Sequence, residues 1–345
     1  MICKKMYHLS MADSEKVETF EQVIQAFQQD YNRIVEQVGK VIVGMENVIE
    51  EVMICLLAGG HALLEGVPGL GKTLLVRTLA DTLDLSFSRI QFTPDLMPTD
   101  IIGTNIVETD ESGGKSFHFQ RGPIFGNLIL ADEINRATPK TQSAVLEAMQ
   151  EQTVTVGRRR HRLPSPFMVL ATQNPIEMEG TYPLPEAQID RFMFKIKLER
   201  PTQSELTEIL DRTTGAEIPV AEKVVNGERV NQMKQQVREV LVASAVKEYI
   251  SKIVLATHPD NEYAPEMVKK YVRYGSSPRG GQAILLAAKV AALRAGRANV
   301  AFDDIEPVVH PALRHRLILS FEGQAEGIEP DEIIAEVLDK IPPGK

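Results

Sequence analysis

The feature that most constrains the fold is a glycine-rich segment, Gly66-Val67-Pro68-Gly69-Leu70-Gly71-Lys72-Thr73. Its glycines can adopt backbone angles that other residues avoid, so successive N–H groups can turn inward around an anion. Lys72 adds a mobile positive charge for the β- and γ-phosphates of a nucleotide, and the Thr73 hydroxyl can ligate Mg²⁺. The spacing therefore predicts a phosphate-binding loop.

The sequence on both sides of the loop supports this prediction. Residues 61–65 have the pattern of a short buried strand, and residues 74–83 carry apolar side chains at helical spacing. Strand, loop and helix thus come in the order that places phosphates at a helix N-terminus. The expected nucleotide contacts in this stretch are Gly66, Pro68, Gly69, Leu70, Gly71, Lys72, Thr73 and Leu74.

Length and composition set wider limits. The 345 residues exceed one domain of about 150 residues, so two domains are expected. A net charge of −9 argues against a surface built mainly for nucleic acid, although a local basic groove is compatible with it. The longest apolar run, residues 52–58, is too short to cross a bilayer.

The first residues and the cysteines bear on the compartment. Residues 1–13 look like an unstructured lead-in, and residues 10–18 are polar where a secretory signal needs an apolar core. Cys3 and Cys55 have no metal-binding or redox spacing, so we interpret them as a tail thiol and a small buried hydrophobic residue. We therefore expect a protein of the reducing cytoplasm.

Two further apolar stretches end in residues suited to phosphate chemistry. Residues 127–131 lead into Asp132 and Glu133, and residues 166–172 lead towards Asn174. Parallel sheets bind ligands at the carboxyl ends of their strands. There Asp132 can hold Mg²⁺, and Glu133 can orient and deprotonate an attacking water. Asn174 could sense the γ-phosphate or hold that water, although an Asn before Pro is by itself only a turn residue.

The remaining patterns up to residue 200 complete a nucleotide-binding domain, which we place at residues 14–200. Strands are expected at 87–92 and 192–198, and hairpins are expected within 101–119 and 153–163. The second hairpin carries the basic run Arg158–Arg162, which fits either an anionic partner or a solvated surface. Between helices predicted at 17–38 and 46–58, Val43 and Gly44 could line an adenine, although core packing would explain them equally well.

From residue 201 to residue 345 the sequence predicts a small helical lid without strands. A capping box at 202–205 opens it, and helical runs follow at about 203–213, 228–240, 244–257, 265–274, 280–295, 303–318 and 330–341. Arg279 comes at the start of one of these helices, where a positive charge is poorly matched to the helix dipole. It therefore needs an anion, and the phosphate chain of the nucleotide is one.

Taken in order, these motifs resemble those of ring-forming AAA+ ATPases, and within them the MoxR family, in the branch with a helix-2 insertion and a presensor-1 hairpin. The resemblance covers about residues 35–320 and rests on GVPGLGKT, ADEINRA, LEAM, ATQNP, LPEAQIDRF, GSSPRG and HRL. It implies an α/β P-loop NTPase fold, in which helices sandwich a parallel five-stranded sheet and a small all-α lid follows.

The resemblance also implies a role for each motif residue. Arg191 would be an arginine finger that reaches into a neighbouring subunit's site, with Arg136 as a rival for this role. His258 departs from relatives, which often carry an arginine there. The other implied roles are Walker A for Lys72 and Thr73, Walker B for Asp132 and Glu133, sensor 1 for Asn174 and sensor 2 for Arg279.

The function that this resemblance implies is hydrolysis of Mg-ATP in a closed ring, expected to be a hexamer. Such proteins are similar to chaperones that remodel or activate protein partners, often ones with a von Willebrand factor A domain. Two alternatives remain. The hairpins and Arg158–Arg162 would suit a nucleic-acid motor, and a slowly hydrolysing scaffold would use the nucleotide only as a switch. Glu133 argues against the scaffold, because a switch needs no water-activating base.

Overall fold

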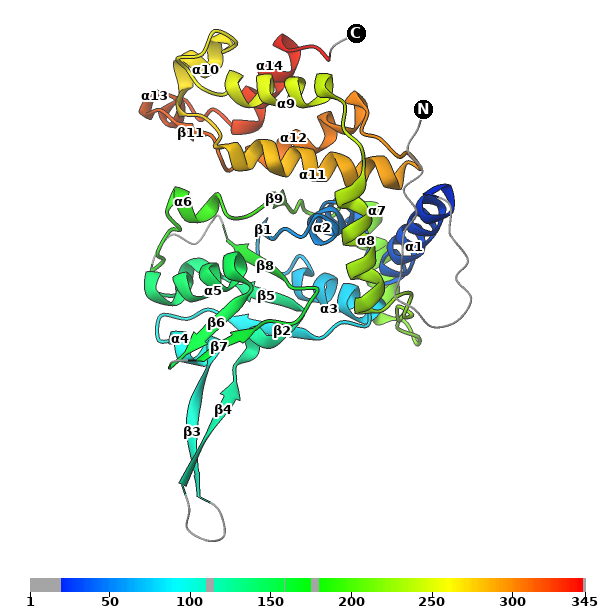
Figure 1. The fold of residues 1–345 in the computed structure, drawn as a ribbon, viewed down its shortest axis with the longest axis vertical. Coiled ribbons are helices and arrows are strands. Elements are labelled where there is room, and N and C mark those ends of the chain that lie inside the picture. The colour runs from blue at the N-terminus through cyan, green and yellow to red at the C-terminus, as the bar shows by residue number, and fades with distance from the viewer. Residues whose placement is uncertain (1–19, 110–114, 158, 175–179, 344–345) are drawn as a thin grey trace.

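The computed structural model describes residues 20–109, 115–157, 159–174 and 180–343. Its centre is a five-stranded sheet in the order β2-β5-β8-β1-β9, with every neighbouring pair parallel, as predicted (Figure 1). The strands are β1 (Ala62–Glu65), β2 (Phe87–Gln91), β5 (Leu128–Asp132), β8 (Met168–Gln173) and β9 (Phe194–Lys197).

Successive apolar residues of the central strands are buried on opposite faces of the sheet. Leu64 and Leu170 belong to a core that includes α1 (Phe20–Val41), α2 (Glu46–Ala58) and α3 (Lys72–Thr82). Their neighbours Leu63 and Val169 belong to a second core with α5 (Pro139–Glu151). Continuous apolar runs are what a parallel strand needs when helices cover both faces. The polar residues that end these strands are therefore left at the sheet edge.

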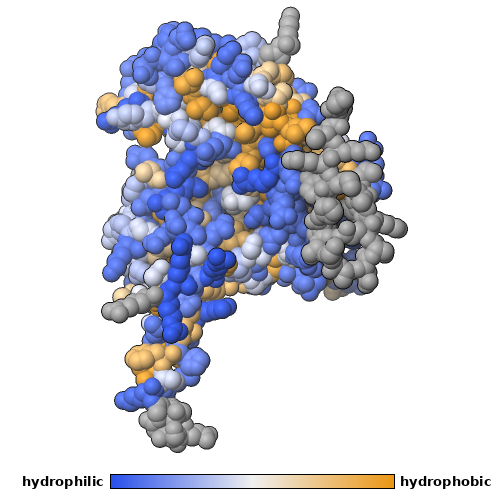
Figure 2. Space-filling view, in the orientation of Figure 1, coloured by the Kyte–Doolittle hydropathy of each residue, from blue (hydrophilic) through white to orange (hydrophobic). Residues whose placement is uncertain are grey.

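The α/β domain carries two hairpins near the short helix α4 (Pro98–Ile102), and the longer one projects away from the domain below α4 (Figure 1). The longer hairpin pairs β3 (Gly103–Thr109) with β4 (Lys115–Arg121), and its Phe117 is 77% exposed. An apolar patch is visible on this projection in Figure 2. An exposed aromatic side chain on a projecting hairpin is a candidate contact for a partner protein.

The second hairpin pairs β6 (Thr153–Val156) with β7 (Arg159–Arg162), so the basic run forms its return strand. Arg158 lies outside the described residues. Arg160 donates to the Thr153 hydroxyl at 2.8 Å and lies 3.5 Å from the Glu151 carboxylate. His161 stacks on Phe119 of the longer hairpin with ring centroids 4.1 Å apart. Part of the basic run therefore serves contacts within this chain.

The lid is mainly helical, but the prediction that it lacks strands was wrong. A two-stranded antiparallel pair joins β10 (Val272–Tyr274) to β11 (Ile318–Leu319). The predicted helices at 265–274 and 303–318 were accordingly too long. Val272, Tyr274 and Ile318 favour extended backbone, and their pairing across the lid overrides a helical pattern that was local. The lid helices are α7 (Gln203–Thr214), α8 (Gly227–Glu239), α9 (Ser244–Ala256), α10 (Glu266–Tyr271), α11 (Pro278–Arg294), α12 (Glu306–Leu313), α13 (Phe321–Ala325) and α14 (Pro330–Lys340).

The lid shares its core with the α/β domain. Helices α8 and α11 both pack against α2, and one cluster of buried residues extends from α1 and α2 into α11 and α12. Cys55 of α2 is fully buried in this cluster, as predicted, whereas Cys3 and the expected lead-in at 1–13 lie outside the described residues. In the part of the chain that is described, no helix combines the length and apolar character needed to cross a membrane.

One acidic side chain of α2 makes stability depend on pH. Burial raises the pKa of Glu51 from 4.5 to about 7, with Glu50 and Asp331 adding to the increase and Arg314 opposing it. Because the folded state binds this proton more tightly than the unfolded state, the contribution to stability is complete below pH 4.5 and is lost as the pH rises through 7.

We expect Glu51→Gln to remove this pH dependence. Relative to the variant, the wild type should lose up to about 2–3 kcal/mol of unfolding free energy between pH 4.5 and pH 8. Urea unfolding of both proteins at a series of pH values measures the difference. Parallel curves for the two proteins would contradict the assignment.

Candidate active site

The predicted phosphate loop, acidic pair and Asn174 meet at the carboxyl edge of the central sheet. Strand β8 lies between β1 and β5, and Glu65 at the end of β1 pairs with Gln173 at the end of β8. On the other side, Gln91 at the end of β2 pairs with Asp132 at the end of β5. The loop that follows β1, the acidic pair that begins at the last residue of β5 and the buried Asn174 after β8 therefore lie side by side.

The glycine-rich loop has the conformation that an anion-binding loop requires. Gly69 and Gly71 have positive φ values of 85° and 77°, a region that glycine enters without steric cost. Helix α3 begins at Lys72, whose ammonium donates to the Gly66 carbonyl at 2.6 Å and to the Val67 carbonyl at 3.3 Å. Burial lowers the Lys72 pKa, while the neighbouring Asp132 and Glu133 carboxylates oppose this change. Lys72 thus lies between the loop and the acidic pair.

The carboxylate of Asp132 is held by two neighbours that the sequence analysis missed. Its Oδ1 accepts the Thr172 hydroxyl at 2.7 Å, and its Oδ2 accepts Arg89 Nε at 3.1 Å and Nη2 at 2.6 Å. Hard oxygen ligands of this kind suit Mg²⁺, and the Thr73 hydroxyl in the first turn of α3 is a second candidate ligand. The donor set therefore fits Mg-ATP, with Lys72 available for the phosphates.

Glu133 adopts a backbone conformation that is unusual for its residue type. Its φ is 56°, in the left-handed region, and its N–H donates to the Thr172 hydroxyl at 2.8 Å. Such a conformation costs on the order of 1–3 kcal/mol for a residue other than glycine, and it persists where the surroundings enforce it. Strain of this kind is concentrated at functional sites, which supports a chemical role for this side chain.

Two donors of the same chain hold the Glu133 carboxylate. Its Oε2 accepts Gln91 Nε2 at 2.9 Å and Arg136 Nη1 at 3.1 Å. Gln91 belongs to the neighbouring strand, so the carboxylate is oriented from both sides. Both donors bind Oε2, so the other carboxylate oxygen, Oε1, is the one through which Glu133 could take a proton from water. Arg136 is thereby engaged in the site of its own chain.

The segment predicted to line the base lies where the loop and the lid meet. A Cβ atom built on Gly71 would lie 3.8 Å from Met45 Cε, so the residues after Gly44 reach the phosphate loop. Gly44 itself has a φ of 70°, and a side chain there would collide with the Glu205 carboxylate of α7. Val43 and Gly44 are half-buried between these elements. Their placement is compatible with a nucleotide base at this boundary.

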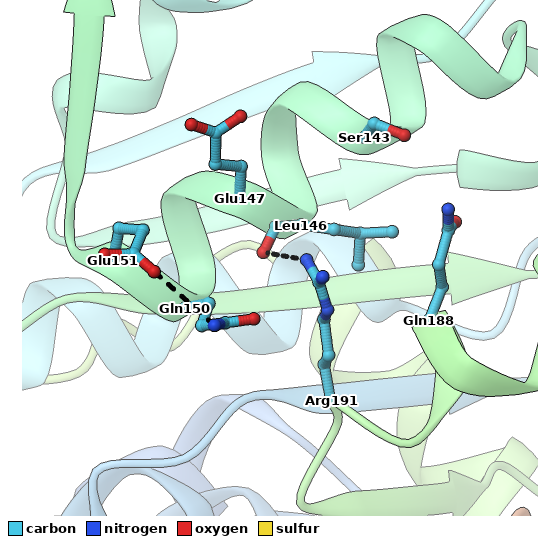
Figure 3. Close-up of a pocket in the computed structure, with 7 residues that line it drawn as sticks. All are labelled: Ser143, Leu146, Glu147, Gln150, Glu151, Gln188 and Arg191. Carbon is cyan, nitrogen blue, oxygen red and sulfur yellow. Dashed lines mark hydrogen bonds between the residues drawn. The ribbon is translucent and has the colours of Figure 1, made fainter.

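Arg191 lies away from the phosphate loop. It follows the short helix α6 (Glu186–Ile189), and its Nη1 donates to the Leu146 carbonyl of α5 at 2.9 Å (Figure 3). It borders a surface hollow whose other lining residues are Ser143, Leu146, Glu147, Gln150, Glu151 and Gln188. Because none of these residues belongs to the loop or the acidic pair, the hollow is a separate feature of the surface.

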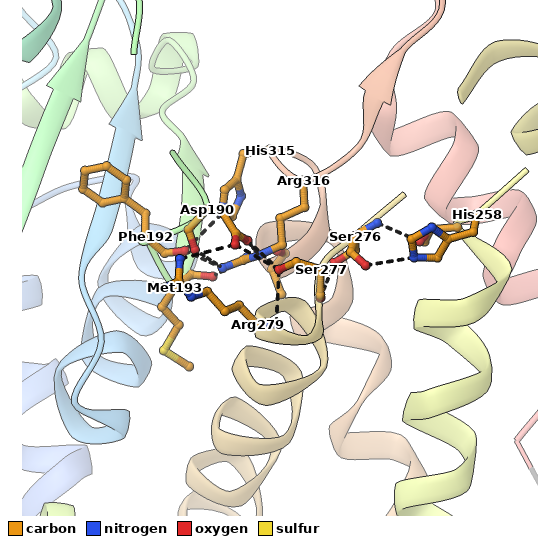
Figure 4. A network of polar contacts seen from close by, with 11 residues as sticks. Asp190, Phe192, Met193, His258, Ser276, Ser277, Arg279, His315 and Arg316 are labelled. Carbon is orange, nitrogen blue, oxygen red and sulfur yellow. Dashed lines mark hydrogen bonds and ion pairs between the residues drawn. The ribbon is translucent and has the colours of Figure 1, made fainter. Parts of the chain in front are cut away.

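Arg279 lies in the first turn of α11, as predicted, and its side chain is 46% exposed. Its Nη1 is 3.5 Å from the Asp190 carboxylate, so the anion beside it in this structure belongs to the protein (Figure 4). His258, the departure noted in the sequence, has its Nε2 3.1 Å from the Ser276 carbonyl. It therefore supports the loop that leads into Arg279.

One feature of the sequence could have identified Arg89 and Gln91, the two donors that sequence reasoning missed. Arg89 and Gln91 alternate along β2, and both contact the acidic pair from the adjacent strand. Parallel strands that end at one edge bring their last residues together, so polar residues near the end of every strand were candidates. The order of the strands, which makes β2 the neighbour of β5, was needed to select these two.

Comparison with protein-family models matches two parts of the chain. Residues 61–194 match the ATPase family associated with various cellular activities (AAA), and residues 265–337 match the AAA lid domain. The first match contains the phosphate loop, the acidic pair and Arg191. The second contains Arg279 and α11 to α13 in full.

Individual relatives match most of the chain. The Chaperone MoxR1 of Mycobacterium tuberculosis is 44% identical over 90% of this chain and 81% of its own length. A Bacillus subtilis protein called YeaC is 42% identical over 92% and 97%, and the Protein MoxR of Methylorubrum extorquens is 30% identical over 90% and 94%. A crystal structure of a candidate ATPase from Cytophaga hutchinsonii superposes with a TM-score of 0.88, at 43% identity, and covers 94% of this chain and 98% of that one.

Proposed function

Because the chain belongs to the MoxR family of AAA+ ATPases, we propose that it hydrolyses Mg-ATP to ADP and phosphate and uses the cycle to remodel protein partners. The observation that carries the proposal is Glu133. Its left-handed backbone directs a carboxylate to the sheet edge beside Lys72 and Asp132, where two side chains orient it. A protein that only binds nucleotide has no need of such a base.

The residues divide the reaction between them. Lys72 and the loop amides hold the β- and γ-phosphates, and Asn174 holds the attacking water or the γ-phosphate. Glu133 takes a proton from the water as its oxygen bonds to the γ-phosphorus, and the bond to the bridging oxygen breaks so that ADP leaves. Thr73 and Asp132 would hold Mg²⁺, which supplies charge neutralisation when bound.

In this proposal a second subunit supplies the arginine finger. Arg191 lies on a surface hollow apart from its own loop, and Arg136 is bound to its own Glu133. Of the two candidates, Arg191 is therefore the better placed to reach a neighbouring site. Head-to-tail contacts form a ring when the rotation between subunits closes, and we propose a hexamer in the cytoplasm.

Lys72→Ala tests whether the loop binds the nucleotide. Removal of the ammonium should weaken ATP binding at least about tenfold, or about 1.4 kcal/mol, because the phosphates lose their nearest cation. Calorimetric titration with Mg-ATP measures the affinity, and turnover should fall with it. Lys234→Ala is a matched control, since this lysine is also partly buried but lies beside Gly59. Equal affinity in the Lys72 variant would contradict the site.

The partner we propose is a protein, of the class that carries a von Willebrand factor A domain. The name Chaperone MoxR1 of one relative supports the class of activity, and the exposed Phe117 of the β3–β4 hairpin supplies a surface for it. We expect a purified protein of that class to bind the Glu133→Gln variant with ATP, and the affinity to fall about tenfold on adding Phe117→Ser. No binding to either variant would refute this partner class.

A further inference from the structure

Arg316, in the segment that follows α12, is a buried arginine for which the proposed chemistry gives no role. Its side chain is 2% exposed. Arginine has five N–H donors, and here each has an acceptor. Nε donates to Asp190 Oδ1 at 2.8 Å, Nη1 donates to the carbonyls of Met193 at 3.1 Å and of Ala312, and Nη2 donates to the carbonyls of Asp190 at 3.1 Å and Phe192 at 2.7 Å.

Four of these five acceptors belong to the residues that flank Arg191. The guanidinium binds Asp190 on one side and Phe192 and Met193 on the other. His315 adds a contact, with Nε2 3.1 Å from the Phe192 carbonyl. The lid thus holds the main chain around Arg191, whose side chain points toward α5 and donates to the Leu146 carbonyl.

The same contacts reach the end of the lid that is expected to face the nucleotide. The hydroxyl of Ser277, which caps α11, lies 2.9 Å from each carboxylate oxygen of Asp190. Arg279 lies two residues further along and is 3.5 Å from Asp190 Oδ2. Asp190 therefore joins the start of α11 to Arg316 and to the turn that carries Arg191 (Figure 4).

We propose that Arg316 is a positioning residue that makes the direction of Arg191 follow the position of the lid over the nucleotide of the same subunit. The inference rests on the proposed function, in which Arg191 completes a neighbouring site. When Arg279 exchanges Asp190 for a phosphate, α11 moves relative to Asp190, and the rigid fork of Arg316 transmits the change to the turn. A lysine cannot replace this fork, because an ammonium lacks the planar array of donors.

Arg316→Lys tests the proposal while it keeps a positive charge beside Asp190. We expect kcat to fall about 10²-fold, as for a catalytic group misplaced by about 1 Å, with KM and the calorimetric Kd for ATP within about twofold of wild type. Arg314→Lys is the matched control. Arg314 is 12% exposed and also joins the lid to the α/β domain, through the Lys195 carbonyl at 3.1 Å, but it makes none of the contacts around Arg191.

The control variant should keep its kcat. An unchanged kcat in Arg316→Lys, or equal losses in both variants, would overturn the proposal. Turnover that survives Lys72→Ala would refute the proposed function itself, and this inference with it. Turnover that depends on Lys72 but not on Arg316 would overturn the inference alone.

A mixing experiment tests whether the loss of turnover in Arg316→Lys comes from the subunit that supplies Arg191 to its neighbour. Wild-type subunits are mixed with excess Glu133→Gln subunits, whose own sites are inactive but whose Arg191 is intact. Turnover per wild-type subunit should persist in this mixture and with Glu133→Gln/Arg314→Lys, and it should collapse with Glu133→Gln/Arg316→Lys. Equal support from all three donors would contradict a role for Arg316 in positioning Arg191.

A second variant covers the case in which Arg316→Lys does not fold. Ser277→Ala removes the half-buried hydroxyl that donates to Asp190 and caps α11 at the Arg279 N–H. It should lower kcat roughly threefold, the size expected for one hydrogen bond, with the Kd for ATP retained. Ser320→Ala removes the cap of α13 elsewhere in the lid and should leave kcat unchanged. The same kcat in both serine variants would overturn the proposal.

Discussion

Replacing Glu133 with glutamine is expected to lower ATP turnover about 10²- to 10⁴-fold, the range found when a general base is removed. Glutamine keeps the shape of the side chain and can still contact Gln91, but it cannot accept a proton from water. The affinity for ATP should stay within about twofold, because the loop and Lys72 are unchanged. Steady-state phosphate release and calorimetric titration measure the two quantities.

Glu65→Gln is the matched control for this change. Glu65 also ends a strand at the same sheet edge, but its carboxylate binds Lys195 at 2.7 Å. Its replacement should leave turnover near the wild-type value. Full activity in Glu133→Gln would show that Glu133 is not the general base. An equal loss in both variants would show that any lost carboxylate at this sheet edge lowers turnover.

Arg191→Ala is expected to lower turnover about 10³- to 10⁵-fold, because an arginine finger stabilises the charge that develops during phosphoryl transfer. ATP affinity should be nearly retained, since in the proposed ring another subunit supplies the finger. Single-turnover rates at protein concentrations that saturate assembly measure the loss.

Gln150 lines the same hollow as Arg191, so Gln150→Ala serves as the matched control. Its turnover is expected to remain normal. Normal turnover in Arg191→Ala would mean that the finger is misassigned. Arg136 would then be the next candidate, despite its contact with Glu133.

The central sheet and the position of the candidate site at its edge could be predicted from sequence because the signals are local. The apolar runs of β1, β5 and β8 stop at polar residues, as in Leu130-Ala131-Asp132, and a parallel sheet collects such ends at one edge. The glycine-rich loop specifies its own conformation through residues such as Gly69 and Gly71, which need positive φ values.

The contacts that hold Glu133 and Asp190 in place depend on strand order and on distant parts of the chain. Gln91 reaches Glu133 only because β2 is the neighbour of β5, although 42 residues separate the two. Arg316 and Asp190 are 126 residues apart, and no spacing rule connects them. The β10–β11 pair also joins distant parts of the chain. It was missed because each strand is too short to show a period of its own.

The proposal that one subunit completes the site of the next is tested most directly by mixing two inactive variants. Arg191→Ala keeps its own Glu133, and Glu133→Gln keeps its own Arg191, so a mixed ring contains interfaces with one intact copy of each. In equal mixtures roughly a quarter of the head-to-tail interfaces should be of this kind. We predict that turnover reappears in the mixture, in proportion to these interfaces. Mixed assemblies that form but stay as inactive as either variant alone would contradict the account.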